Sequence, residues 1–135
     1  MKITTHRNLP PFTKVIESAL PGAVCDGIID HFKHSENTEQ LDMEGAPTFT
    51  QQNLNVHHGE MVKPLTKYLM NAFYTFRKSQ LGLQKYVNGK FLLEEFRVKR
   101  YNSNSEDRFD PHVDVNGGDS LPRLLSFLFY LNDDF

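Results

Sequence analysis

The sequence has no tryptophan, a single cysteine, no long apolar run and no excess of basic residues. The one thiol, Cys25, cannot form an internal disulfide, and this usage fits a reducing compartment. No stretch approaches the roughly 20 apolar residues that a membrane-spanning helix needs, and the first residues lack the apolar core of a secretory signal. A formal net charge of -2 argues against nucleic-acid binding, which normally leaves a basic excess. We therefore expect a cytoplasmic protein without nucleic-acid or membrane partners.

What the sequence does contain is the composition of an ordinary globular domain. Its 135 residues are 39% hydrophobic and 24% charged, and this length allows one domain with a core of its own. We expect residues 1–135 to form a single domain. The pattern over residues 1–88 is mainly helical, and the pattern over residues 89–135 is typical of strands. Helices first and strands after favour an α+β fold.

Two segments have apolar side chains at helical spacing. The first follows Pro21, which suits the first turn of a helix, and should end near residues 34–37. Its apolar stripe consists of Val24, Cys25, Ile28, Ile29 and Phe32. The second covers residues 60–80, with a stripe of Met61, Leu65, Leu69, Ala72, Phe73 and Phe76. Residues 35–55 are polar and broken by glycine and proline, which predicts a loop with room for one short strand.

Four segments have the patterns of strands. A short strand is expected at residues 12–16, and longer ones at residues 91–101, 109–115 and 124–131. The last is a nearly continuous apolar run, Leu-Leu-Ser-Phe-Leu-Phe-Tyr-Leu, short enough to be a buried strand. Alternation in residues 91–101 separates two faces: Glu94, Phe96, Val98 and Arg100 share one, and Glu95, Arg97, Lys99 and Tyr101 share the other.

The most informative motif is Phe-Asp-Pro-His-Val-Asp at residues 109–114. On an extended segment, His112 and Asp114 project from the same face because strand side chains alternate with period two. Pro111 favours that extended approach, since a residue before proline is pushed away from helix. One imidazole and one carboxylate are two of the three ligands of the facial triad in non-haem Fe(II) oxygenases. A bare His-x-Asp is common and usually structural, but this context points to an enzyme.

The order of motifs over residues 91–135 resembles the prolyl 4-hydroxylase-like branch of the Fe(II)/2-oxoglutarate-dependent dioxygenases. That family has a strand ending in tyrosine, a loop, an aromatic residue, His-x-Asp, a glycine-containing loop, an arginine, an apolar strand and Tyr-Leu-Asn. The matching residues here are Tyr101, Phe109, His112, Asp114, Gly117, Gly118, Arg123, Tyr130, Leu131 and Asn132. The opening helix after Leu20 and Pro21 is similar to that family's in a looser way.

This resemblance implies a fold and a chemistry. The fold would be N-terminal helices packed on a partial double-stranded β-helix, a cupin-like jelly roll. His112 and Asp114 would bind Fe(II), and the hydroxyls of Tyr101 and Tyr130 would hold the co-substrate 2-oxoglutarate, with ascorbate as a further candidate cofactor. The reaction would hydroxylate a prolyl or related residue in a peptide, or a small molecule. In this chemistry the protein supplies only a few of the metal ligands, because 2-oxoglutarate chelates the metal through two oxygens and one position stays open for O2.

The sequence departs from that family at its end. The second histidine, the Arg or Lys that pairs with the far carboxylate of 2-oxoglutarate, and the Gly-Gly-Glu-Thr-like turn after Tyr-Leu-Asn do not occur before Phe135. We therefore expect a truncated piece of a longer enzyme, or an enzyme whose remainder comes from a separate chain. Two ligands alone should hold iron poorly. The apolar residues 124–131 would then form an exposed sheet edge through which the chain self-associates.

Other interpretations of the same residues stay open. His57 or His58 would complete the triad only in an order of ligands foreign to that family. His31 and His34 lie one turn apart on the first helix and suit either a zinc site or solvated surface. Arg123 either points towards the substrate or forms a salt bridge with Asp119 or with a neighbour of Asp114. The whole chain is alternatively a catalytically inactive remnant or interaction module of the same fold, or a simple metal-binding cupin-like protein.

Overall fold

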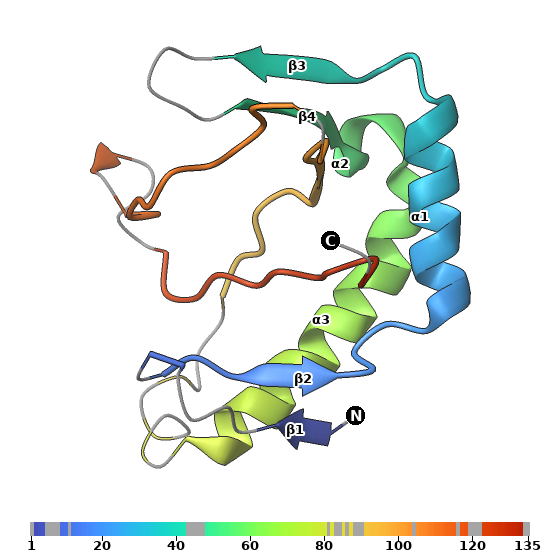
Figure 1. Ribbon diagram of the computed structural model, residues 1–135. Helices are drawn as coiled ribbons and strands as arrows, with labels where there is room; N and C mark the ends of the chain where they lie inside the picture. Colours follow the sequence, from blue (N-terminus) through green and yellow to red (C-terminus); the bar gives the residue numbers. More distant parts are fainter. Residues whose placement is uncertain are drawn as a thin grey trace.

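The computed structural model (Figure 1) describes residues 2–4, 9–10, 12–42, 48–80, 82, 85, 87, 91–103, 105–115, 117–118 and 123–133. Within these ranges the elements are, in order, β1 (Lys2–Thr4), β2 (Val15–Glu17), α1 (Gly22–His34), β3 (Glu39–Asp42), β4 (Thr48–Asn53), α2 (Leu54–His57), α3 (Gly59–Ser79) and β5 (Arg97–Arg100). Helices and an antiparallel sheet in one chain confirm the predicted α+β class.

The three-stranded sheet has the order β3-β4-β5 and is antiparallel throughout. Its register places Gln51 of β4 between Glu39 of β3 and Lys99 of β5. Side chains along β4 alternate between two faces. The helix-side face carries Gln52 and Val98, which contact α1 and the core; the opposite face, here called the far face, carries Phe49, Gln51, Asn53, Arg97 and Lys99.

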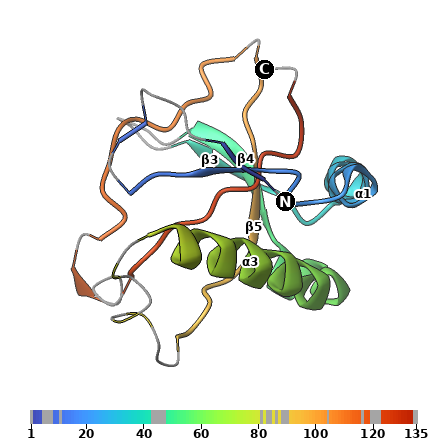
Figure 2. The same cartoon turned by 90° about the horizontal axis from the view of Figure 1, so that it is seen from below.

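Both predicted long helices are confirmed within a residue or two of their expected ends. In α3, five of the six residues of the expected stripe are buried, and the sixth, Met61, packs against the core. Ile28 of α1, Leu54 of α2 and Leu65 of α3 form one buried cluster, and Val98 and Leu131 pack against it. Figure 2 shows α3 as a layer beside the strands. No helix among the described residues is long and apolar enough to span a membrane.

The structure corrects two strand predictions in the first half of the chain. Residues 35–55 do not form a loop with one short strand but the antiparallel pair β3 and β4, followed by α2. The alternation of apolar residues that marks a strand is missing here because β4 buries polar side chains, Thr50, Gln51 and Gln52. The strand expected at residues 12–16 is instead β2, since Phe12 has a positive φ of 65° that no strand accommodates.

Three strand predictions in the second half also need correction. Only Arg97–Arg100 of the strand expected at residues 91–101 is formed, and no strand occurs in residues 109–115 or in residues 124–131. These segments have no ladder partner among the described residues, and without paired N–H and C=O groups an extended chain is not a strand. Nor are residues 124–131 buried throughout. Half-buried side chains alternate there with exposed ones, the latter being Leu124, Ser126, Leu128 and Tyr130.

The buried cluster yields a test of the fold. Replacing Leu65, 3% exposed at the meeting point of the three helices, with alanine should lower the free energy of unfolding by about 2–5 kcal/mol, because the cavity left behind cannot fully collapse. The matched control is Val56→Ala, whose side chain is 65% exposed and should cost less than about 0.5 kcal/mol. Urea unfolding monitored by circular dichroism measures both; equal losses would contradict this core.

Candidate metal and co-substrate site

The structure brings His112 and Asp114 together although their segment is not a strand. Nε2 of His112 lies 3.3 Å from Oδ1 of Asp114, and both side chains are a little under half exposed. Solvent and small ligands can therefore reach the two facing atoms. The predicted convergence of imidazole and carboxylate is present, by a route other than strand alternation.

The remaining polar atoms of this pair are held by neighbours. Nδ1 of His112 lies 2.9 Å from the carbonyl oxygen of Asp110. A carbonyl only accepts, so Nδ1 donates its hydrogen to Asp110, and Nε2 is the nitrogen that faces Asp114. On the carboxylate, Ser126 donates its hydroxyl hydrogen to Oδ2, which leaves Oδ1 facing the imidazole. Hydrogen bonds of this kind to the outer atoms orient metal ligands in proteins.

The electrostatics of Asp114 favour its charged form. The hydrogen bond from Ser126 is the largest cause that lowers the pKa of Asp114; the nearby His112 and Arg123 lower it further, while burial opposes them. Asp114 is therefore a carboxylate at neutral pH and a suitable ligand for a hard or borderline cation.

The donor set fits a divalent metal in part. Two ligands at bonds of about 2.1 Å in neighbouring positions around a six-coordinate metal lie about 3.0 Å apart, close to the 3.3 Å between Nε2 and Oδ1. The described part of the chain contains no group of three or more His, Cys, Asp or Glu residues able to hold a metal. His112 and Asp114 therefore supply two positions and leave the others to water or a chelating ligand.

An aromatic cluster joins this pair to the sheet. The ring of Phe109 stacks on His112 with centroids 3.8 Å apart. Phe49 of β4 lies 5.7 Å from Phe109 and 5.3 Å from Tyr101, between centroids. Nζ of Lys99 lies 4.6 Å from the centroid of Phe49 and 4.7 Å from that of Phe109, a cation–π arrangement. The pair is thus attached to the far face through Phe49, which is 2% exposed.

The two predicted co-substrate tyrosines are neighbours. Burial raises the pKa of Tyr101, and Asp107 and Tyr130 are close enough to raise it further. Tyr101 is 45% exposed and Tyr130 is 72% exposed, so both side chains are accessible from solvent. Tyr101 contacts Phe49, Phe49 contacts Phe109, and Phe109 stacks on His112. Tyr130 lies four residues beyond Ser126 on the same alternating face of its segment.

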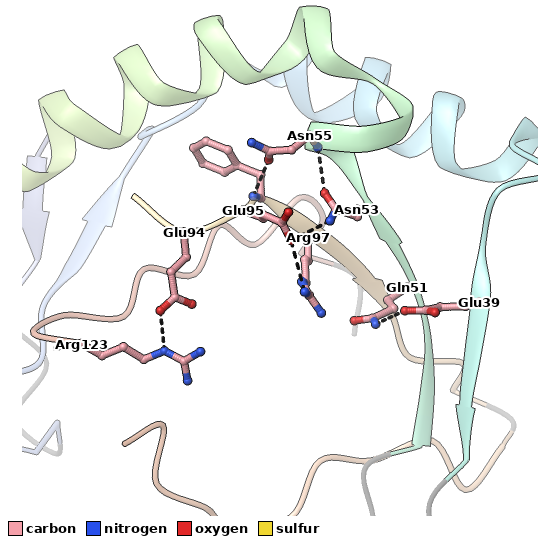
Figure 3. A network of polar contacts seen from close by, with 9 residues as sticks. Glu39, Gln51, Asn53, Asn55, Glu94, Glu95, Arg97 and Arg123 are labelled. Carbon is pink, nitrogen blue, oxygen red and sulfur yellow. Dashed lines mark hydrogen bonds and ion pairs between the residues drawn. The ribbon is translucent and has the colours of Figure 1, made fainter. Parts of the chain in front are cut away.

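Arg123 fixes the loop that carries the pair. Its Nε lies 2.6 Å from Oε1 of Glu94 (Figure 3), and a terminal nitrogen donates to the carbonyl oxygen of Asp114 at 2.7 Å. Arg123 therefore forms a salt bridge, but its partner is Glu94 and not a neighbour of Asp114; Asp119, the other expected partner, lies outside the described residues. Arg123 thereby links residues 91–96 to the candidate ligand loop.

Of the two histidines on α1, His34 lies on the solvated surface, one of the two expected alternatives, whereas His31 does not. His34 lies 3.3 Å from the carboxylate of Asp30 on the surface of α1, and His31 does not pair with it. Instead the ring of His31 stacks against that of His58, with centroids 3.6 Å apart, and Nδ1 of His58 lies 3.2 Å from Glu60. This contact joins α1 to the start of α3 and is remote in sequence from both ends of the His-x-Asp motif.

Several residues of the site were missed by sequence reasoning. Phe49 lay in a segment expected to be a loop, and Ser126 in a strand expected to be buried. Lys99 was placed on the correct face of its strand, but it was interpreted as part of an exposed basic stretch. Pairing of β4 with β5 brings Phe49 and Lys99 together, and only the alternation in residues 91–101 gave a signal for it. Ser126 reaches the site through its hydrogen bond to Asp114.

No family model, curated protein or solved structure matches this chain.

The contact between Ser126 and Asp114 yields a test by titration. The pKa of Asp114 is lower in the folded chain than in the unfolded one, so its ionisation stabilises the fold above the unfolded value. That contribution is lost as the pH falls through the folded value. Ser126→Ala should raise the pKa of Asp114 towards its ordinary range, as measured by carbon NMR of the side-chain carboxyl. Ser79→Ala, which removes a hydroxyl bonded to the Phe76 carbonyl, is the control. An unchanged Asp114 titration in Ser126→Ala would refute the assigned hydrogen bond.

Proposed function

We propose that this chain carries the metal-binding part of an Fe(II)- and 2-oxoglutarate-dependent dioxygenase similar to the prolyl 4-hydroxylases. His112 and Asp114 are the proposed iron ligands, and Tyr101 and Tyr130 the proposed partners of 2-oxoglutarate. The sheet β3-β4-β5, together with the extended residues 91–96, 109–115 and 123–131, is the proposed half of a double-stranded β-helix, with α1 and α3 outside it. A reducing compartment such as the cytoplasm suits an iron centre that works from the ferrous state.

One observation supports this proposal above the rest. Nε2 and Oδ1 face each other at 3.3 Å while Nδ1 and Oδ2 are occupied by Asp110 and Ser126. A simple surface ion pair needs no such arrangement of all four atoms. The pair is pre-organised, because these contacts fix the orientation of the imidazole ring and of the carboxylate before a metal binds.

The chain's own residues would have three tasks. His112 and Asp114 bind the metal on one side, which leaves room for a bidentate 2-oxo acid and for O2. Tyr101 and Tyr130 offer phenolic hydrogens to the carboxylates of the co-substrate. Phe109, supported by Phe49, covers one face of the imidazole and excludes water from it. Bound iron would supply the activation of O2 that is coupled to oxidation of 2-oxoglutarate.

The substrate class proposed from the resemblance is a prolyl or related residue in a peptide. The competing proposal is a non-catalytic interaction module that self-associates through residues 124–131. The exposed side chains of Leu124 (63%) and Leu128 (78%) favour it, because apolar residues on an unpaired extended segment are a common route to association. Metal binding separates the two proposals.

Metal binding by the 135-residue chain is the direct test. Anaerobic calorimetry with Fe(II), and with Co(II) as an air-stable substitute, should give one weak saturable site that binds more tightly when 2-oxoglutarate is added, since the chelator fills further positions. His112→Ala or Asp114→Ala should weaken binding beyond the roughly 10- to 100-fold typical of losing an outer hydrogen-bond partner. Release of succinate from 2-oxoglutarate in the presence of Fe(II) is the accompanying measure of turnover.

The chain offers a matched control for this experiment. His34 and Asp30 lie at the same 3.3 Å, but on the exposed surface of α1 and through Nδ1. His34→Ala should leave metal affinity unchanged. Equal effects of His34→Ala and His112→Ala on metal affinity, or a metal affinity that 2-oxoglutarate does not change, would rule out the assigned ligands. A metal-free dimer in light scattering would support the interaction module.

A further inference from the structure

A second polar site lies on the sheet, towards the end of β4 that leads into α2. It is a pocket of about 390 Å³ whose walls include Glu39 of β3, Gln51, Gln52 and Asn53 of β4, His57 of α2 and Arg97 of β5. The His-x-Asp motif contributes nothing to it, and of the candidate residues considered from the sequence only His57 lines it. Its volume is ample for a molecule of amino-acid size.

The pocket has walls of opposite charge with carboxamides between them (Figure 3). On the β3 side, Gln51 donates to one carboxylate oxygen of Glu39. On the β5 side, a terminal nitrogen of Arg97 lies 3.3 Å from Glu95, whose same oxygen accepts from Asn53 at 2.7 Å. The Arg97 side chain is half exposed and keeps further donors for a ligand, because a guanidinium has five N–H groups.

The pocket and the candidate metal pair share the far face of the sheet. Gln51 is in register with Lys99, and Phe49 follows two positions away on the same face of β4, about 7 Å along the strand. Lys99 lies above Phe49 and Phe109, and Phe109 stacks on His112. A ligand that extends from Arg97 past Lys99 would thus point towards the metal ligands.

We propose that this pocket is the substrate site of the oxygenase and that it takes a dipolar, amino-acid-type group, with its carboxylate at Arg97 and its ammonium or amide N–H at Glu39. The carboxamides of Gln51 and Asn53 pair with an amide in the remainder of the ligand, since each offers one donor and one acceptor function. The link to catalysis rests on the proposed function; the binding of the ligand does not.

Lys99 supports the position of the carboxylate. It stands two residues from Arg97 on the same face, and no ion pair involves it in the described part of the chain. Burial lowers the pKa of Lys99, and the charge of Arg97 lowers it further, while Asp114 raises it. Two cations that repel each other on one face are stabilised by an anion bound near both.

The same dipolar chemistry has two sources: a free amino acid, which has both charged groups, or the last residue of a peptide, which has only the carboxylate. Nitrogen–proton NMR of the metal-free chain distinguishes them. The probes are L-glutamine, N-acetyl-L-glutamine and L-glutaminamide, and the readout is the shift of the Asn53 and Gln51 side-chain amides and of Arg97 Nε.

Binding of glutamine alone assigns the pocket to a free amino acid, and equal binding of the N-acetyl form assigns it to a peptide terminus. Arg97→Gln should weaken either ligand roughly 10- to 100-fold, the effect of losing a charge-assisted hydrogen bond, and Arg97→Lys should restore part of it. Glu39→Gln keeps an oxygen that can accept from Gln51 but removes the negative charge. It should weaken the binding of glutamine but not that of its N-acetyl form.

Arg100→Gln is the control, because Arg100 is on the same strand but lies over Phe32 on the helix-side face. It should leave all three affinities unchanged, and thermal unfolding of each variant checks that the fold persists. The proposal is overturned if none of the probes shifts these signals, if glutaminamide alone binds, or if Arg97→Gln and Arg100→Gln act alike. Because no metal is present, this outcome is independent of the iron test.

Discussion

Antiparallel pairing of β4 with β5 is the constraint on which both candidate sites depend. It sets Tyr101 and Lys99 beside Phe49, and it sets Arg97 beside Asn53, so one face of two short strands carries the aromatic support of the metal pair and the charged wall of the pocket. A slip of one residue would move all of these side chains to the face that packs against α1. Val98 opposes such a slip, because it packs against the buried cluster of three helices.

Much of the helical half of the fold could be predicted from sequence. The stripes of α1 and α3 have the spacing of a single buried face, and burial of that face is what stabilises a helix in a protein. The strands β3 and β4 were hidden for the opposite reason. Gln51 and Gln52 are buried as hydrogen-bonded polar groups. A search for alternating hydrophobic residues therefore does not detect this strand. Such contacts depend on partners 12 and 17 residues away.

The candidate ligands illustrate a different limit. His112 and Asp114 were predicted to converge because strand side chains alternate, yet they converge in an irregular segment. Their geometry comes from a carbonyl at Asp110, a hydroxyl at Ser126 and the ring of Phe109. The spacing of two residues was informative about which groups meet. It held no information about the hydrogen bond from Ser126, because that segment approaches Asp114 only in the folded chain.

In residues 124–131, odd-numbered and even-numbered side chains have different roles. The odd-numbered side chains are half-buried, and among them Phe127 approaches Phe73 of α3 and Leu131 packs against the buried cluster. Even-numbered ones include Ser126 and Tyr130, which face the candidate ligands and Tyr101. Side chains that pack against the core and side chains near the candidate site therefore alternate along one segment. A substitution at one kind of position can leave the other kind unchanged. An inserted or deleted residue would exchange the two sets at once, and the segment should tolerate changes of identity far better than changes of length.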